Sequence, residues 1–284
     1  MTKKKILITG SSGFIGSKIF ENISKNNKTY IILRSKKKIK KIRNLNIIRY
    51  WDFDELNFQL KKIKVDIVIH CATHYVKEHS YNDIQKLSDS NVLFGNIILE
   101  NLGYLKVKKF INLSTVWEDY NSIKNDNPNL YAVYKKNFTH LINFYKKKFL
   151  NISFYNLMIS DTFGASDKRS KIINILRNNY KKNKNTKIIS KNLYLNLLNV
   201  DDIVNAVNMI IKKNVKPGQY VLKNKKDFKV SDIIDSFNQI FTKKIKITWI
   251  SNKIIKQKIY PYQKLNYWTP TKSKLKHILN IINN

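Results

Sequence analysis

The first half of the chain alternates short β-branched, apolar runs with longer segments in which apolar residues recur at helical spacing. The short runs predict buried strands at 5–9, 29–34, 46–50, 66–72 and 109–115. The longer segments predict helices that include 14–25, 80–101 and 130–149. Strands and helices in this alternation are typical of an α/β fold, a doubly wound parallel sheet with helices on both faces.

The second half of the chain has a different pattern. A sixth strand is expected at 152–160, and the segment 190–204, which contains NLYLNLLNVDDI, is expected to extend the same sheet. The rest of 161–284 predicts mixed helices and hairpin-like pieces that form a smaller mixed α/β lobe from non-contiguous segments. We therefore expect a first domain over 1–160 and a second, mainly substrate-binding lobe over 161–284.

The net charge and its distribution along the chain indicate which kind of ligand to expect. The 284 residues include 54 Lys and Arg against 19 Asp and Glu, a net charge of +35 that would suit a phosphate polymer. The lysines, however, are spread from end to end together with Asn and Ile, as an AT-rich coding sequence would produce, and no nucleic-acid-binding motif is present. We expect a small anionic ligand and no specific nucleic-acid partner.

Three further features bear on location and metal content. No run of about 18 or more apolar residues is present, so we expect no membrane partner. The single cysteine, Cys71, excludes an intramolecular disulfide and fits the reducing cytoplasm. His70 and His74 span the end of a predicted strand and would not converge on one ion, so we expect no metal.

Three of the seven glycines fall inside TGSSGFIG, directly after the first predicted strand and at the start of the first predicted helix. A sharp turn, close approach of the backbone to a pyrophosphate, and tight packing of helix on strand each exclude a side chain. A helix N-terminus also offers free N–H groups to phosphate. The stretch therefore predicts a dinucleotide site, formed by Gly10, Ser11, Ser12, Gly13, Phe14, Ile15 and Gly16.

TGxxGFIG resembles the signature of the extended short-chain dehydrogenases, the NAD(P)-dependent epimerase/dehydratase family that acts on nucleotide sugars. The resemblance continues along nearly the whole chain, through DIVIHCA, NVLFGN, NLST, YAVYK, DTFGASD and NVDDI. It implies a Rossmann-type fold, a nucleotide-sugar substrate and, by analogy, a homodimer. It also implies cofactor contacts near the adenine from Asp52 and Phe53, and after the fourth strand from Cys71, Ala72 and Thr73.

The end of the second predicted strand indicates which dinucleotide is used. An acidic residue there binds the ribose hydroxyls of NAD, whereas a cation accommodates the phosphate of NADP. This chain has Arg34 and Ser35 at that point, and no Asp or Glu occurs between Glu21 and Asp52. We expect NADP(H), with NAD(H) as the open alternative.

The family works with a Ser or Thr, a Tyr, and a Lys four residues after the Tyr. Such a Tyr and Lys share one helix face, and the nearby ammonium lowers the pKa of the phenol. The spacing alone says little, because it occurs here at Tyr104, Tyr120, Tyr131, Tyr180 and Tyr260. Context favours Tyr131 with Lys135, at the start of a predicted helix that follows the LST strand end. Thr115 is the expected hydroxyl partner, since Ser114 should face the other side of the strand.

Departures from the family pattern limit which of the family's reactions are expected of this chain. Its 4,6-dehydratases carry Asp-Glu directly after the Thr, where this chain has Val116 and Trp117. The cysteine and histidine of the related 3,5-epimerase/4-reductases are also missing. The remaining set suits hydride and proton transfer at one carbonyl, as in the 4-ketoreductases of CDP- or GDP-linked sugars. Substrate contacts are then expected from His74, Thr115, Val116, Asp161, Arg169 and Lys171.

The activity that the resemblance implies is NADPH-dependent reduction of the C4 keto group of a CDP- or GDP-linked 4-keto-6-deoxy or 3,6-dideoxy sugar. By family analogy alone, the setting is biosynthesis of a surface polysaccharide such as a capsule or an O-antigen. An NAD-dependent 4-epimerase, a 4-dehydrogenase and a non-catalytic dinucleotide-binding protein are the open alternatives. The sequence leaves the nucleotide base and the stereochemistry at C4 undetermined.

Overall fold

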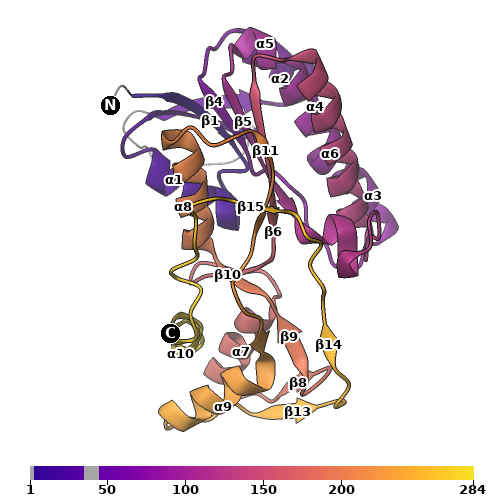
Figure 1. Ribbon diagram of the computed structural model, residues 1–284, viewed down its shortest axis with the longest axis vertical. Coiled ribbons are helices and arrows are strands. Elements are labelled where there is room, and N and C mark those ends of the chain that lie inside the picture. The colour runs from indigo at the N-terminus through magenta and orange to yellow at the C-terminus, as the bar shows by residue number, and fades with distance from the viewer. Residues whose placement is uncertain (1–2, 35–44) are drawn as a thin grey trace.

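A sheet of eight parallel strands forms the centre of the larger part of the molecule (Figure 1). The computed structural model describes residues 3–34 and 45–284. The strands are β1 (Lys5–Thr9), β2 (Lys28–Arg34), β3 (Leu45–Tyr50), β4 (Ile67–His70), β5 (Lys109–Thr115), β6 (Ser153–Ile159), β11 (Gly218–Leu222) and β15 (Gln263–Lys264). Across the sheet they run in the order β15-β11-β6-β5-β4-β1-β2-β3.

Both faces of the sheet are apolar, because successive residues of each strand point to opposite sides. In β1, Ile6 and Ile8 join the core on one face and Leu7 joins the core on the other. The helices are α1 (Phe14–Ile23) and α8 (Val200–Lys212) on the first face, and α2 (Phe53–Lys61), α4 (Phe94–Glu100), α5 (Leu102–Leu105) and α6 (Leu130–Lys148) on the second. The predicted doubly wound α/β fold is confirmed.

The helix predicted at 80–101 is continuous but irregular. It consists of α3 (Tyr81–Ser88), the π-helical turn η1 (Asp89–Leu93) and α4. Single π turns inside α-helices are frequent at functional sites. This one contains Asn91, a buried residue whose Oδ1 accepts a hydrogen bond from the backbone N–H of His74 at 2.7 Å. The irregular turn therefore holds the loop that follows β4.

The large sheet is extended by β11 and β15 and not by residues 190–204, which corrects the expectation drawn from their apolar pattern. Asn196 bonds through its side chain to Asn224 and Asp227, and Asn199 caps α8, so polar side chains interrupt this run and fix its direction. The pairs that it forms instead are β9 (Leu193–Leu195) with β12 (Phe228–Lys229) and β14 (Ile255–Lys256), and β10 (Leu197–Asn199) with β7 (Asp161–Phe163).

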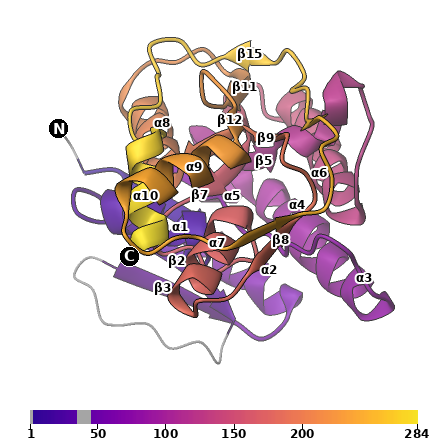
Figure 2. The ribbon, with the colours of Figure 1, turned by 90° about the horizontal axis from the view of Figure 1, so that it is seen from below.

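A third hydrophobic core lies beyond the end of the large sheet, in the lower part of Figure 1. Its residues come mostly from α7 (Ile172–Lys181), α9 (Val230–Ile240) and α10 (Leu275–Asn283), which Figure 2 shows gathered at this end of the molecule. Beside them β8 (Thr186–Ile188) pairs with β13 (Ile247–Trp249). The chain leaves this smaller lobe to form β11, re-enters it, and leaves again to form β15, so the lobe is assembled from separate segments.

Asp202, in the first turn of α8, holds the last part of the chain against the helix layer. Its fully buried carboxylate accepts from the backbone N–H groups of Thr271 and Lys272, at 2.8 and 3.0 Å from Oδ1, and from the Ser273 hydroxyl at 2.6 Å from Oδ2. Its main-chain oxygen accepts from the Trp268 indole N–H at 3.0 Å. These bonds fix the connection between β15 and α10.

We expect Asp202→Asn to lower the free energy of unfolding by about 2–3 kcal/mol, because the amide cannot accept with both of its terminal atoms and leaves buried donors unpaired. Asp201→Asn is the matched control: this neighbour is exposed, and its loss should cost less than about 1 kcal/mol through the helix dipole. Urea unfolding of both variants measures the difference. Equal losses would show that the buried carboxylate does not anchor the connection.

Candidate active site

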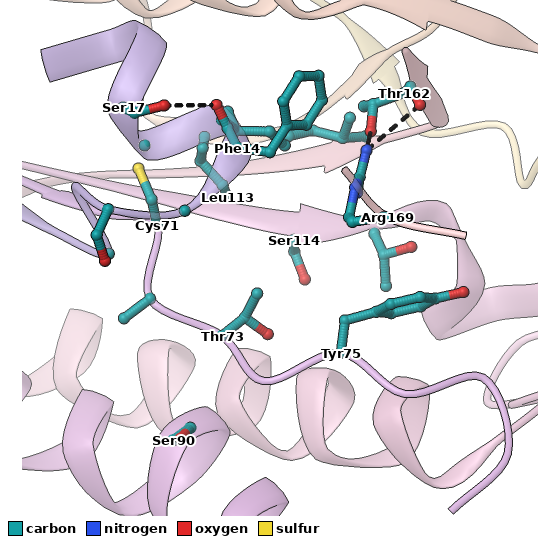
Figure 3. Close-up of a pocket in the computed structure, with 18 of the residues that line it drawn as sticks. Phe14, Ser17, Cys71, Thr73, Tyr75, Ser90, Leu113, Ser114, Thr162 and Arg169 are labelled. Carbon is teal, nitrogen blue, oxygen red and sulfur yellow. Dashed lines mark hydrogen bonds between the residues drawn. The ribbon is translucent and has the colours of Figure 1, made fainter. Parts of the chain in front are cut away.

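A cavity of about 850 Å³ opens at the carboxyl ends of the central strands, beside the segment that leads into the smaller lobe (Figure 3). Open parallel sheets place their ligands at this edge. The lining comes from the glycine-rich turn, the ends of β2, β5 and β6, the loop after β4, and the start of α6. Its polar members include Ser12, Arg34, Thr73, Ser90, Ser114, Thr115, Tyr131, Asp161, Lys168, Arg169 and Lys171.

The glycine-rich turn brings three backbone segments into contact. Gly10 has φ +66°, and a Cβ at this position would lie 2.6 Å from the backbone nitrogen of Ala72. A Cβ at Gly16 would lie 2.1 Å from the carbonyl oxygen of Gly10. Gly13 precedes α1, whose N-terminus has no side-chain cap. The uncapped helix end and the bare backbone beside the cavity fit the pyrophosphate of a dinucleotide.

The other residues predicted in this stretch divide between the cavity and the core. Ser12, Phe14 and Ile15 line the cavity. Ser11 is 4% exposed and lies outside the lining. Ser17, which was not predicted, also lines it and donates from its hydroxyl to the carbonyl of Phe14 at 3.1 Å (Figure 3).

Arg34 stands at the mouth of the cavity where β2 ends. It is exposed, and its Nη2 lies 3.5 Å from the hydroxyl oxygen of Ser90 in the π turn. Both residues line the cavity, so a cationic and a hydroxyl group face the position where a dinucleotide carries its adenosine ribose. The predicted contact of Ser35 falls outside the described residues.

Asp52 and Phe53, which were expected to contact the cofactor, are not among the residues that line the cavity. Asp52 caps α2, because its Oδ1 accepts from the backbone N–H of Glu55 at 2.8 Å. Phe53 packs on Tyr50, with 6.3 Å between ring centroids. Tyr50 itself lines the cavity, with Phe94 stacked against it at 6.0 Å. An aromatic residue at the end of the third predicted strand was the signal that could have identified Tyr50.

The loop after β4 is fixed by Thr9 and His70. The Thr9 hydroxyl accepts from the backbone N–H groups of Cys71 and Ala72, each at 3.2 Å, and lies 3.0 Å from Nδ1 of His70. Because its two lone pairs are used, its own proton goes to Nδ1. Burial, followed by the charge of Lys135, lowers the pKa of His70 to about 3. Cys71, Ala72 and Thr73 line the cavity, and the cofactor contacts expected of them stay a prediction.

His74, for which a substrate contact was predicted, does not line the cavity. Its backbone N–H and C=O bond to Asn91, and its ring lies 3.9 Å from the carboxylate of Asp83 on α3. Tyr75 lines the cavity in its place and packs edge-on against Tyr131, with 5.0 Å between ring centroids. The sequence held no signal for Tyr75, since tyrosines are common along the chain.

The structure brings Thr115 and Tyr131 together in the cavity, with Lys135 behind its wall. The Thr115 hydroxyl, at the end of β5, accepts from the backbone N–H of Trp117 at 3.2 Å and keeps its proton free to donate. Lys135, one turn after Tyr131 on α6, is 2% exposed and donates from Nζ to the carbonyl of Leu113 at 2.7 Å. Ser114 also lines the cavity, although strand alternation predicted that it would face away.

The pKa values of Tyr131 and Lys135 depart from the expectation that the ammonium lowers the pKa of the phenol. Burial raises the pKa of Tyr131, and the groups that lower it are the Thr73 hydroxyl and Arg169. Burial also lowers the pKa of Lys135 to about 8, against the attraction of Glu118 and Cys71. The phenol is therefore protonated at neutral pH, as a proton donor must be.

The cations predicted to meet the substrate already have partners in the protein. Arg169 binds Asp167 through Nε and Nη2, both at 2.8 Å, and its guanidinium lies 4.6 Å from the ring centroid of Phe14. Lys171 pairs with Asp161 at 3.0 Å and stands over the Trp117 ring at 4.6 Å. Arg169, Lys171 and Asp161 all line the cavity.

Val116 does not line the cavity, contrary to the predicted substrate contact. It is 1% exposed and packs with Met158 and Val221, because the turn η2 (Val116–Ser122) directs it inward. Trp117 lines the cavity instead. Glu118 and Asp119, which follow in the same turn, are buried and also lie outside the lining. The described part of the site thus holds no pair of acidic groups beside Thr115.

Within residues 3–34 and 45–284, no group of three or more His, Cys, Asp or Glu side chains is placed to hold a metal ion. In the same ranges, no helix has both the length and the apolar character needed to cross a membrane.

The chain is similar to one protein-family profile and to individual proteins of known activity. The profile of the NAD dependent epimerase/dehydratase family matches residues 6–222. The CDP-abequose synthase of Yersinia pseudotuberculosis is 28% identical over 220 residues, which are 76% of this chain and 75% of that protein. The dTDP-D-glucose 4,6-dehydratase of Dictyostelium discoideum is 30% identical over 275 residues, which are 81% of this chain and 60% of that protein.

Solved structures share the fold over almost the full length. The UDP-N-acetylglucosamine 4-epimerase of Methanobrevibacter ruminantium M1, in complex with UDP-N-acetylmuramic acid, has a TM-score of 0.81 at 17% identity, covering 99% of this chain and 98% of that chain. The UDP-glucuronic acid 4-epimerase of Bacillus cereus, in complex with UDP-glucuronic acid and NAD, has a TM-score of 0.77 at 20% identity, covering 98% and 99%. At these identities the likeness concerns the fold.

The buried His70 predicts how stability depends on pH. Its pKa is about 3 in the folded protein against 6.5 for an ordinary histidine, so the unfolded chain binds the proton first and stability falls as the pH drops below 6.5. Between about pH 7 and about pH 5 this one group should cost about 2 kcal/mol. His70→Phe, which keeps an aromatic ring against its three Phe neighbours, should remove that loss.

Urea unfolding at the two pH values measures the effect, and His79→Gln is the control because His79 is exposed. The control should keep the full pH dependence of the unaltered protein. A His70→Phe protein that loses stability on acidification as steeply as the control would contradict the assignment.

Proposed function

The chain belongs to the NAD-dependent epimerase/dehydratase family, and from this premise we propose that it is an NADPH-dependent 4-ketoreductase of a nucleotide sugar. The substrate class is a CDP- or GDP-linked 4-keto-6-deoxy or 3,6-dideoxy sugar. The observation that carries the proposal is one cavity that contains the bare glycine turn, Thr115 and Tyr131, with Lys135 behind its wall and, among the residues that the structure describes, no acidic pair beside Thr115.

The proposed roles follow from this arrangement. NADPH, when bound, supplies the hydride that reduces C4. Tyr131 donates its phenolic proton to the carbonyl oxygen, which becomes the hydroxyl of the product. The hydroxyl of Thr115 donates a hydrogen bond to the same oxygen and orients the carbonyl. Lys135, whose Nζ holds the carbonyl of Leu113, keeps the end of β5 and the start of α6 together and places positive charge near the phenolate that is left.

Reduction suits the state of Tyr131 better than oxidation does. A phenol whose pKa is raised, as that of the half-buried Tyr131 is, is a proton donor at neutral pH, whereas oxidation of an alcohol requires a phenolate that accepts a proton. The 4-dehydrogenase alternative therefore needs a further group to lower the pKa of Tyr131. The Asp-Glu pair of the 4,6-dehydratases has no counterpart directly after Thr115, where Val116 and Trp117 stand, and Glu118 and Asp119 lie outside the cavity lining.

The preference for NADP(H) rests on Arg34. It is exposed at the end of β2 with the Ser90 hydroxyl beside it, and no carboxylate occurs between Glu21 and Asp52 to bind an unmodified ribose. NAD(H) is the second candidate, because the epimerase from Bacillus cereus that shares this fold is in complex with NAD. An NAD-dependent 4-epimerase is accordingly the alternative function.

The CDP-linked substrate is favoured by the similarity to CDP-abequose synthase. Exposed Lys168 lines the cavity near the paired Arg169 and Lys171, which gives this region a positive charge that suits a diphosphate. The setting that we propose is biosynthesis of a capsule or O-antigen sugar in the cytoplasm, where the single Cys71 is free.

Tyr131→Phe removes the proton donor and should lower kcat for NADPH oxidation by about 100-fold or more with 4-keto sugars linked to CDP, GDP or dTDP. Tyr134→Phe on the same helix, outside the cavity lining, is the matched control and should stay within about twofold of the unaltered protein. Absorbance at the NADPH band follows the reaction. Full activity in Tyr131→Phe would refute the mechanism, and tightly bound NAD with no reductase activity would favour the epimerase.

Arg34→Ala should raise the dissociation constant of NADPH about tenfold, the equivalent of about 1.4 kcal/mol, because the charge that faces the ribose phosphate is lost. Binding of NADH by the same variant serves as the internal control and should not change. Titration followed by NADPH fluorescence measures both constants. A parallel loss of both cofactors, or tighter binding of NADH by the unaltered protein, would argue for NAD(H).

A further inference from the structure

Glu118 is a fully buried carboxyl group directly behind the wall of the cavity. Its Oε1 accepts from the hydroxyl of Ser114, which lines the cavity, and from the hydroxyl of Thr139 at 2.9 Å. Its Oε2 is equally buried and has no hydrogen-bond partner among the described residues. An ionised carboxylate in such a place requires a compensating positive charge.

Lys135 is the cation placed to compensate it. Leu113, whose carbonyl accepts from Lys135, and Ser114, whose hydroxyl donates to Glu118, are consecutive residues of β5. Thr139, the second donor to Glu118, lies one turn after Lys135 on α6. The same strand and the same helix thus hold both the buried acid and the buried base, and each acts on the charge of the other.

The other charged and titratable groups near Glu118 are engaged elsewhere. Lys136 pairs with Asp119 at 2.8 Å, and Asp119 also accepts from the hydroxyl of Tyr262 at 2.5 Å. Tyr131 carries no positive charge and cannot compensate the charge of Glu118. On the other side of Lys135, burial raises the pKa of Cys71 to about 12, so this thiol is neutral at physiological pH. Glu118 is left as the anion that faces Lys135.

We propose that Glu118 is the buried counter-ion of Lys135 and a positioning residue for the reaction: its carboxylate keeps Lys135 protonated and holds Ser114 at the cavity wall. The inference rests on the proposed function only where it concerns the reaction, since the pairing of charges concerns the protein alone. Glu118 is not itself one of the residues that line the cavity, and it acts through Lys135 and Ser114.

The directions of the pKa shifts agree with this assignment. Burial raises the pKa of Glu118 to about 7, and burial lowers that of Lys135 to about 8. The raised carboxyl pKa adds stability at low pH that is lost as the pH rises through about 7. The lowered ammonium pKa makes stability rise again as the pH passes about 8, because the folded protein then releases the proton that the unfolded chain keeps.

The test is the free energy of unfolding against pH for the full-length protein and for Glu118→Gln, which keeps an oxygen for Ser114 and Thr139 but carries no charge. Between about pH 5 and about pH 7 the free energy of unfolding of the variant should rise more steeply with pH than that of the unaltered protein, because the contribution of Glu118, which opposes that of His70, is lost. The rise that starts near 8 should begin about one pH unit lower, because Lys135 has lost its counter-ion. A purely structural role would shift the curve equally at all pH values and would overturn the proposal.

Two further variants complete the design. Glu78→Gln, at an exposed glutamate, is the matched control and should leave the curve unchanged. Thr139→Val keeps the carboxyl group but removes one of its donors, which raises the pKa of Glu118 further. In that variant the fall in stability should extend to higher pH, and this variant decides the matter if Glu118→Gln does not fold. An unchanged fall in Thr139→Val would then overturn the proposal.

The reaction supplies a separate measurement. The alkaline limb of the kcat/KM profile should move about one pH unit lower in Glu118→Gln, in step with Lys135. A moved stability curve with an unmoved kcat/KM limb would overturn the positioning role. A moved stability curve in a protein that reduces none of the 4-keto sugars would support the charge pair and refute the proposed function, so the two failures are distinguishable.

Discussion

The active-site end of the fold depends on two positions where no side chain can be accommodated. At Gly10 the turn after β1 lies against the backbone of the loop after β4, and at Gly16 the first turn of α1 lies against the carbonyl of Gly10. These approaches fix β1, α1 and the β4 loop relative to one another. As a consequence, the hydroxyl of Thr9 accepts hydrogen bonds from the backbone N–H groups of both Cys71 and Ala72. The uncapped N-terminus of α1 then lies beside the cavity.

Acidic groups are scarce in this basic protein, and several of them organise its interior. Asp202 gathers the N–H groups of the connection to α10, Asp167 holds Arg169 at the cavity, and Asp119 joins Lys136 to Tyr262. Each buried carboxylate is matched by donors or by a cation, as the cost of burying charge demands. The large positive charge is thus mostly a property of the surface, since Lys135 is the one lysine or arginine among the buried residues that the structure describes.

The central strands could be predicted because each is a local apolar run, and the glycine turn because its chemistry needs no knowledge of distant residues. The partner of a strand could not be predicted in the same way: residues 193–199 are as apolar as β6, yet Asn196 and Asn199 direct them into other pairings. A motif predicted Thr115 and Tyr131, which the structure places in the cavity lining, but the motif did not reveal that Tyr75 lines the cavity and His74 does not. Such orientation depends on Asn91, which lies 17 residues away in a π turn.

The order in which the strands are made has a consequence for synthesis on the ribosome. β15 covers the outer edge of β11, and its two residues, Gln263 and Lys264, follow most of the smaller lobe in the chain. Until they emerge, β11 or, earlier, β6 presents unpaired backbone groups that could recruit a strand of another nascent chain. Translation speed over this last stretch, and chaperones that shield such an edge, therefore bear directly on the yield of native protein.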